Sequence, residues 1–149
     1  MCIRDSMLIA TILEKKGHDV ATLRPDQLVS AAVTLMAERR IGAVVIEDKG
    51  AVVGIFSERD LVKQLARDGH SALDQPLKKA MTAPVITCSA EDRLDQVLAT
   101  MSQRHVRHMP VMEGKSLRGM ISIRDLVRQR LEEKELETAT LLDISRMHG

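Results

Sequence analysis

Hydrophobic positions along the chain follow two kinds of spacing. Between residues 28 and 40 the apolar side chains recur three and four positions apart, which is typical of an amphipathic helix. Two β-branched runs, at 43–46 and 51–56, flank a short polar stretch and predict a hairpin. A short apolar run at 20–23 precedes the helix, and a second helix is expected to begin at Ser57. The pattern therefore predicts the order strand, helix, strand, strand, helix.

The same order of elements occurs a second time. A shift of 65 residues aligns 20–66 with 85–131 without an insertion and gives 11 identical positions. Seven identities fall close together, at Gly54/Gly119, Ser57/Ser122, Arg59/Arg124, Asp60/Asp125, Leu61/Leu126, Val62/Val127 and Gln64/Gln129. One unit of about 50 residues buries too little surface to be stable alone. We therefore expect an α+β fold in which two repeats pack sheet to sheet with pseudo-twofold symmetry, with clefts between the halves that suit a ligand.

The remaining segments are divided by periodicity and by turn residues. The expected divisions are a non-native leader at 1–6, an N-terminal helix at 7–19, the first repeat at 20–66, a linker at 67–84, the second repeat at 85–131 and a C-terminal helical extension at 132–149. The linker carries Gly69, Pro76 and Pro84 and is expected to hold one short helix near 77–81.

Composition narrows the classes of function. The chain has 149 residues, of which 44% are hydrophobic and 29% charged, as in an ordinary globular protein. Its 22 Lys and Arg against 21 Asp and Glu give a net charge of +1, and it has one Phe, no Tyr and no Trp. Nucleic-acid binding is therefore disfavoured, because the chain lacks both a basic field and stacking rings.

Cysteine usage and hydropathy suggest a compartment. Cys2 and Cys88 lie far apart with no CxxC spacing, so neither a disulfide framework nor a zinc knuckle is predicted. No apolar run is long enough to span a membrane, and no secretory signal pattern opens the chain. We expect a cytoplasmic protein with neither a membrane nor a nucleic acid as its partner.

The repeated motif has the form Gly-h-h-Ser-x-x-Asp, where h is apolar, and spans 54–60 and 119–125. In one interpretation Ser is a helix N-cap and Asp completes a capping box. In the other, the free N–H groups of the helix N-terminus, the Ser hydroxyl and the neighbouring Arg bind an anion, while the carboxylate accepts hydrogen bonds from a ribose diol. The residues alone leave both interpretations open.

A basic cluster spans residues 104–108. His105 and His108 lie three positions apart, but no Cys or acidic residue stands at ligand spacing, so no metal site is predicted and phosphate contact is favoured over metal binding. The sequence contains neither GxGxxG nor GxxxxGK[ST], and no nucleophile constellation can be argued. Catalysis is therefore not expected.

The gapless duplication and its two motifs resemble a pair of cystathionine-β-synthase (CBS) domains, a Bateman module, of the stand-alone bacterial type. The resemblance covers residues 20–131. It implies a regulatory sensor without catalytic activity or an obligatory cofactor. It also implies that AMP, ADP, ATP, NAD(H) or S-adenosylmethionine binds between the repeats, that two modules form a disc-like homodimer, and that an unidentified protein is regulated.

The resemblance also implies two ligand sites. The first comprises Asp125 for the ribose, Ser122, Arg124, Arg107 and His108 for the phosphate, and Thr22, Ile41, Gly42 and Met120 around the base. The second comprises Asp60, Ser57, Arg59, Thr87, Val106 and Ile55. Since the counterparts of Arg107 and His108 are Gly42 and Ala43, the Asp125 site is expected to be the tighter one for a nucleotide phosphate. The alternative is an interaction module without a ligand, in which Ser and Asp only cap helices.

Two further expectations concern the surface and the pocket. The apolar side chains between Leu126 and Ile144 suit a partner surface, although the tail could also fold back on its own module. Because Phe56 is the only aromatic residue, an adenine must be held between aliphatic walls such as Ile41 and Val106 and by backbone hydrogen bonds.

Overall fold

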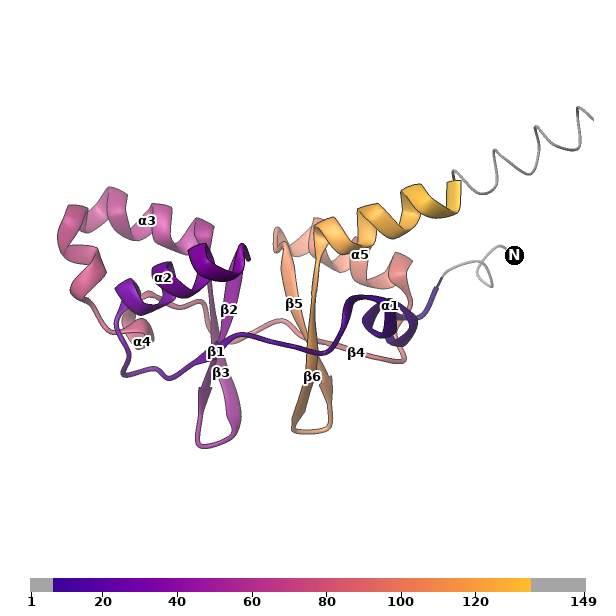
Figure 1. The fold of residues 1–149 in the computed structure, drawn as a ribbon, viewed down its shortest axis with the longest axis horizontal. Helices are drawn as coiled ribbons and strands as arrows, with labels where there is room; N and C mark the ends of the chain where they lie inside the picture. The colour runs from indigo at the N-terminus through magenta and orange to yellow at the C-terminus, as the bar shows by residue number, and fades with distance from the viewer. Residues whose placement is uncertain (1–6, 135–149) are drawn as a thin grey trace, which may run out of the picture.

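The computed structural model describes residues 7–134, which form two three-stranded sheets at the centre with helices on their outer sides (Figure 1). The first repeat contains β1 (Thr22–Leu23), α2 (Val29–Arg39), β2 (Ala43–Asp48), β3 (Ala51–Ser57) and α3 (Glu58–Asp68). The second contains β4 (Cys88–Ser89), α5 (Leu94–Arg104), β5 (His108–Glu113), β6 (Ser116–Ser122) and a helix whose described part is 123–134, here called the C-terminal helix. The predicted order of elements and the α+β class are confirmed.

The duplication extends to backbone detail. In each sheet the first strand pairs in parallel with the second, and the second pairs antiparallel with the third. The hairpin register shifts after Ile46 in one sheet and after Val111 in the other. The C-caps of α2 and α5, Arg40 and His105, are left-handed with φ of 55° and 56°. These pairs are separated by the same 65 residues as the identities, so the two repeats share one backbone plan.

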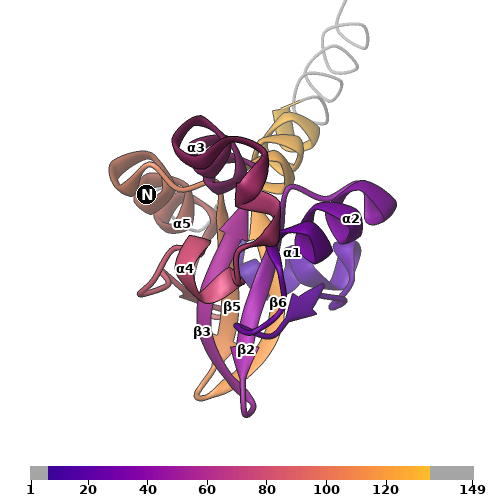
Figure 2. The same cartoon turned by 90° about the vertical axis from the view of Figure 1, so that its left-hand side faces the viewer.

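The two sheets face each other across a small apolar layer. Ala43 and Val45 from β2 and Met120 from β6 are buried there, with the partly buried Val52 and Ile55 beside them. Viewed from the side, the hairpins β2–β3 and β5–β6 lie one behind the other (Figure 2). The expected sheet-to-sheet packing is therefore confirmed.

The sequence pattern did not predict where the segments outside the repeats pack. The helix α1 (Ile9–Lys16) precedes the first repeat, yet Ile9, Ile12 and Leu13 are buried in the core of the second (Figure 1). The linker forms a 3-10 helix, η2 (Gly69–Asp74), and then α4 (Leu77–Ala80), whose Leu77 and Ala80 complete the core of the first repeat. The 3-10 helix was not predicted.

Glycines in the third strand of each sheet make room for these helices. A Cβ on Gly119 would lie 2.8 Å from Leu13 Cδ2, and one on Gly54 would overlap the side chain of Met81. The motif glycine is therefore required for close packing on β3 and β6.

The expected leader at 1–6 and the part of the helical extension at 135–149 lie outside the described residues. Within residues 7–134, no helix has the length and apolar character needed to cross a membrane.

Candidate functional site

The motif serine and aspartate cap a helix in both repeats. At α3, the Ser57 N–H donates to Asp60 Oδ2 at 2.9 Å, and the Asp60 N–H donates back to Ser57 Oγ at 3.4 Å. At the C-terminal helix, the Ser122 N–H donates to Asp125 Oδ2 at 2.8 Å, and the Asp125 N–H donates to Ser122 Oγ at 3.1 Å. Both motifs therefore have the geometry of a capping box.

A cavity of about 550 Å³ opens beside the Asp60 cap, which we call the Asp60 cavity. One wall comes from β3 and α3, and the other from the end of α5 and the start of β5, so both repeats contribute. The lining residues are Gly42, Ile55, Ser57, Glu58, Arg59, Asp60, Val62, Lys63, Thr82, Arg104, His105, Val106, Arg107 and His108. Its volume lies in the range typical of small-molecule sites.

Asp60 stands on the wall of this cavity with its carboxylate already oriented. Oδ1 accepts a hydrogen bond from Thr82 Oγ1 at 2.8 Å, and Oδ2 accepts from the Ser57 backbone and hydroxyl. Thr82 is held by a reciprocal pair of backbone hydrogen bonds with Ile55. All donors to this carboxylate are neutral groups, so it retains its acceptor character toward a ligand hydroxyl.

The lining of the cavity is rich in basic side chains. Arg59 and Lys63 come from α3, like Asp60, and Arg104 and Arg107 come from the second repeat, whereas Asp60 and Glu58 are the carboxylates in the lining. Arg59 Nη1 donates to the carbonyl of His105 at 2.9 Å and so ties the two walls together. The side chains produce a local positive field, which a net charge of +1 for the whole chain does not reveal.

His108 lies between the two caps. It begins β5, pairs in register with Ser122, and also lines the Asp60 cavity. Burial and the nearby charge of Lys16 lower its pKa, while Glu58 and Asp125 oppose the shift. A Cβ on Gly42 would lie 3.3 Å from the His108 ring, so the glycine leaves the space that this ring fills.

Asp125 has a different partner from Asp60. Lys16, at the end of α1, donates from Nζ to Asp125 Oδ2 at 2.6 Å and to the carbonyl of Met120 at 2.6 Å. Burial by itself would raise the pKa of this carboxyl, but hydrogen bonds from Lys16 and Ser122 and the charge of Lys16 outweigh it and lower the pKa. The Asp125 carboxylate is thus neutralised by a cation from outside the repeat.

The structure groups the candidate residues differently from the sequence. In the set expected around Asp60, five residues line the cavity, namely Ile55, Ser57, Arg59, Asp60 and Val106, whereas Thr87 is exposed and outside this lining. In the set expected around Asp125, Gly42, Arg107 and His108 line the Asp60 cavity instead. Thr22 is exposed on β1, and Ile41 packs against the core of the first repeat. Arg124 lines a groove on the C-terminal helix.

Several residues at the two caps were not found from the sequence. Glu58 and Lys63 lie within a turn of Asp60 on the same helix, so helical spacing could have identified them. Thr82 and Lys16 lie outside the aligned ranges 20–66 and 85–131 and carry no motif. The basic cluster 104–108 lies in the lining of the Asp60 cavity, which is compatible with its expected role in phosphate contact. Residues 7–134 contain no group of three His, Cys, Asp or Glu side chains able to hold a metal ion.

The comparisons with known proteins agree on one family. The CBS domain family matches residues 13–67 and again 77–132. A crystal structure of the CBS-domain containing protein ATU1752 from Agrobacterium tumefaciens is 40% identical, with a TM-score of 0.81, and the match covers 84% of this chain and 94% of that one. The CBS domain-containing protein CBSX3, mitochondrial, of Arabidopsis thaliana is 29% identical over 92% of this chain and 71% of its own length.

A solved structure with bound ligands shares the fold. The CBS domain pair of protein MJ0100, solved in complex with 5′-methylthioadenosine and S-adenosyl-L-methionine, is 23% identical with a TM-score of 0.77. The match covers 86% of this chain and 98% of that one.

Proposed function

This chain belongs to the CBS-domain family, with two CBS domains in tandem, and we propose that it is a regulatory sensor that binds an adenosine-containing ligand in the Asp60 cavity. The ligand class comprises AMP, ADP, ATP, NAD(H) and S-adenosylmethionine. Binding would shift the population between two states of the module, which requires that the ligand bind one state more tightly.

One observation carries the proposal: an oriented carboxylate and several basic side chains line one cavity built by both repeats. Asp60 is placed to accept hydrogen bonds from a ribose diol, and Arg59, Arg104 and Arg107 are placed to contact a phosphate. Guanidinium groups suit phosphate because their donors match its oxygens. The adenosine compounds bound by the MJ0100 pair support the same ligand class.

The base would lie against aliphatic side chains. The only aromatic residue, Phe56, is fully buried in the core of the first repeat and cannot stack on a ligand. Ile55 and Val106 line the cavity and offer apolar surface on opposite walls. Specificity for adenine would then depend on backbone hydrogen bonds to the edge of the base.

In this proposal Asp60, rather than Asp125, supplies the principal site. The sequence ranked Asp125 first because Arg107 and His108 were assigned to it, but both residues line the Asp60 cavity. The Asp125 carboxylate, in turn, is bonded to the Lys16 ammonium.

Ligand-dependent melting tests the proposal. A ligand that binds only the folded chain raises the melting temperature, by an amount equivalent to about 2.7 kcal/mol at a hundredfold excess over Kd. We expect such a rise with at least one of AMP, ATP, NAD and S-adenosylmethionine, and its loss in Asp60→Asn. Asp74→Asn, an exposed carboxylate on η2, is the matched control and should keep the rise. No rise with any of the four compounds would refute ligand sensing.

The natural ligand can be sought in the purified protein. Because the chain has no Tyr or Trp, it absorbs little near-ultraviolet light, and strong absorbance would come from a bound nucleotide. Denaturing fresh protein and analysing the released compounds by mass spectrometry would identify it. Asp60→Asn, purified in parallel, should carry less of the compound.

The second candidate function is an interaction module without a ligand. The complete capping boxes favour it, because Ser57 and Asp60 satisfy each other and need no ligand to explain their presence. This candidate predicts that Asp60→Asn changes stability but that none of the four compounds changes melting. The melting panel therefore distinguishes the two functions.

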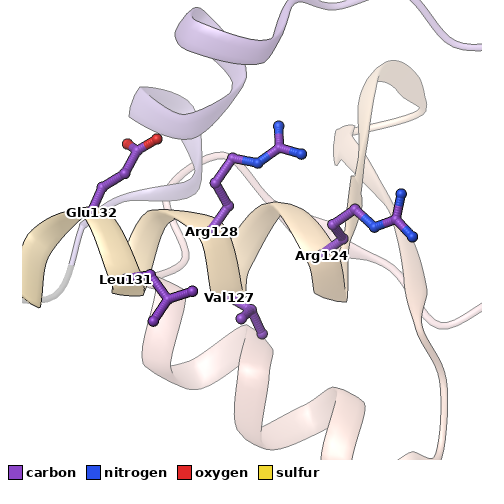
Figure 3. A pocket seen from close by; sticks show the side chains of 5 residues that line it. All are labelled: Arg124, Val127, Arg128, Leu131 and Glu132. Atoms are coloured by element: carbon purple, nitrogen blue, oxygen red, sulfur yellow. The ribbon is translucent and has the colours of Figure 1, made fainter. Parts of the chain in front are cut away.

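We also propose that the module forms a homodimer through the outer faces of α3 and the C-terminal helix. Val62, Val127 and Leu131 are 65%, 45% and 56% exposed there, which is high for aliphatic side chains. Figure 3 shows Val127 and Leu131 on one side of the C-terminal helix, where a groove of about 360 Å³ also includes Arg124, Arg128 and Glu132. Antiparallel pairing of two copies would bring the arginines of one helix close to the glutamate of the other.

The remaining expectations stay part of the proposal. We propose that the chain catalyses no reaction, has no obligatory cofactor and regulates a protein partner through its ligand. We also propose a reducing, cytoplasmic compartment. Cys88 is consistent with a reducing compartment, because its buried thiol forms no disulfide within residues 7–134.

A further inference from the structure

Lys16 contacts two groups at the Asp125 site. Its ammonium donates to Asp125 Oδ2 and to the Met120 carbonyl, both at 2.6 Å, while the Ser122 N–H donates to the same carboxylate oxygen. The side chain of Asp125 is only 15% exposed and that of Lys16 35% exposed, so water weakens this pair less than a fully exposed one. The cation is held by two acceptors at once.

Within residues 7–134, no cation bonds the Asp60 carboxylate as Lys16 bonds Asp125. Its carboxylate is bonded by the Thr82 hydroxyl and by Ser57, and a cavity opens beside it. The segments that supply the two partners occupy related places. Leu13, near the end of α1, lies against Gly119, and Met81, just after α4 and before Thr82, lies against Gly54. One cap therefore has a neutral partner and the other a charged one.

We propose that Lys16 is an internal competitor that occupies the Asp125 cap and keeps it from binding a nucleotide until the ammonium is displaced. This inference rests on the proposed function. The ammonium lies against Asp125 Oδ2 and the Met120 carbonyl, where a ribose hydroxyl bonded to that carboxylate oxygen would have to lie, so the ligand and the docked ammonium exclude each other. The module then binds its first ligand at Asp60, and the second cap opens only at higher ligand concentration.

Displacement would involve the last turn of α1 rather than the whole helix. Ile9, Ile12 and Leu13 are buried in the core of the second repeat and anchor the earlier turns. Lys16 is the last residue of α1, and Gly17 follows with a φ of 103°, a conformation that glycine adopts readily. A local rearrangement at this point can free the ammonium without disrupting the core.

The experiment isolates the Asp125 cap by using an Asp60→Asn background. Isothermal titration with ATP compares Asp60→Asn with the double variant Asp60→Asn/Lys16→Met. Lys16→Met removes the charge-assisted hydrogen bond that ATP must otherwise displace from Asp125. Because the ion pair is partly exposed, its free energy is reduced, and we expect ATP affinity to rise about five- to tenfold in the double variant. In the otherwise unchanged chain, Lys16→Met should raise the stoichiometry from one ATP per chain toward two.

Controls separate this inference from the proposed function. Lys79→Met removes an exposed lysine from α4 and should leave the titration unchanged. Lys16→Gln serves as a second variant if Lys16→Met folds poorly. Equal or weaker ATP binding at Asp125 without Lys16 would overturn the inference while leaving ligand binding at Asp60 intact. Absence of ATP binding in every protein would overturn this inference, and the proposed function would fall with it only if none of the four compounds raised the melting temperature.

Discussion

At the scale of single residues, two identical aspartates have different partners. Asp60 and Asp125 form the same cap, yet a threonine hydroxyl bonds the first and a lysine ammonium the second. The repeat could predict both carboxylates because they lie inside the duplicated unit. It could not predict Thr82 or Lys16, which come from segments that flank the repeats and approach the caps only through folding.

The Lys16–Asp125 pair predicts a loss of stability in acid. A carboxyl whose pKa is lowered on folding stabilises the folded chain above its ordinary value of 3.8, and this contribution is lost as pH falls through the lowered value. Between about pH 6 and about pH 3, the free energy of unfolding should therefore fall by about 1 kcal/mol less in Asp125→Asn than in the wild type. Urea unfolding across this range measures the difference.

Asp74→Asn is the control for acid stability, because this carboxylate is exposed and its side chain forms no hydrogen bond or ion pair within residues 7–134. Its unfolding curves should follow those of the wild type. Identical pH dependence in Asp125→Asn and the wild type would show that the ion pair contributes nothing to stability.

At the scale of elements, periodicity predicted strands and helices well but did not predict which core each helix completes. The stripe of α2 and the β-branched runs of β2 and β3 determine their own buried faces. The helix at 7–19 was expected from the sequence, but its docking on the second repeat depends on the space above Gly119. That space exists only after β6 is formed. The grouping of Arg107 and His108 with Asp60 depends in the same way on how the sheets face each other.

The docking of α1 predicts a large effect for one leucine. Leu13 is 1% exposed and packs in the core of the second repeat, so Leu13→Ala should lower the free energy of unfolding by about 2–5 kcal/mol. The midpoint of urea unfolding measures it. Leu28→Ala, at a site 42% exposed, should change stability by about 0.5 kcal/mol or less. Similar effects for the two variants would contradict the assigned packing of α1.

At the scale of the whole molecule, the two repeats form one folding unit. The sheets share an apolar layer, α1 completes the second core and α4 the first. The cavity has walls from both repeats, tied by the Arg59–His105 hydrogen bond. A change in the relative position of the repeats would therefore alter both the site and the outer helices.

The proposed homodimer predicts a change in mass on altering one apolar position. Leu131→Asp places a charge at the centre of the proposed interface and should weaken dimerisation about a hundredfold, equivalent to about 2.7 kcal/mol. Light scattering across a dilution series measures the mass. Leu28→Asp, at another exposed leucine, should leave it unchanged. A wild type that remains monomeric at every concentration would refute the dimer.

The position of α1 has a consequence for biosynthesis. The ribosome makes Ile9, Ile12 and Leu13 before both repeats, but the surface that buries them includes Leu94, Val111 and Leu126. The apolar face of α1 must therefore stay unburied until almost all of the second repeat has been translated. The first repeat needs only the segment through α4 to complete its core. Helix α1 therefore docks last, and the single folding unit is complete only when the second repeat has formed.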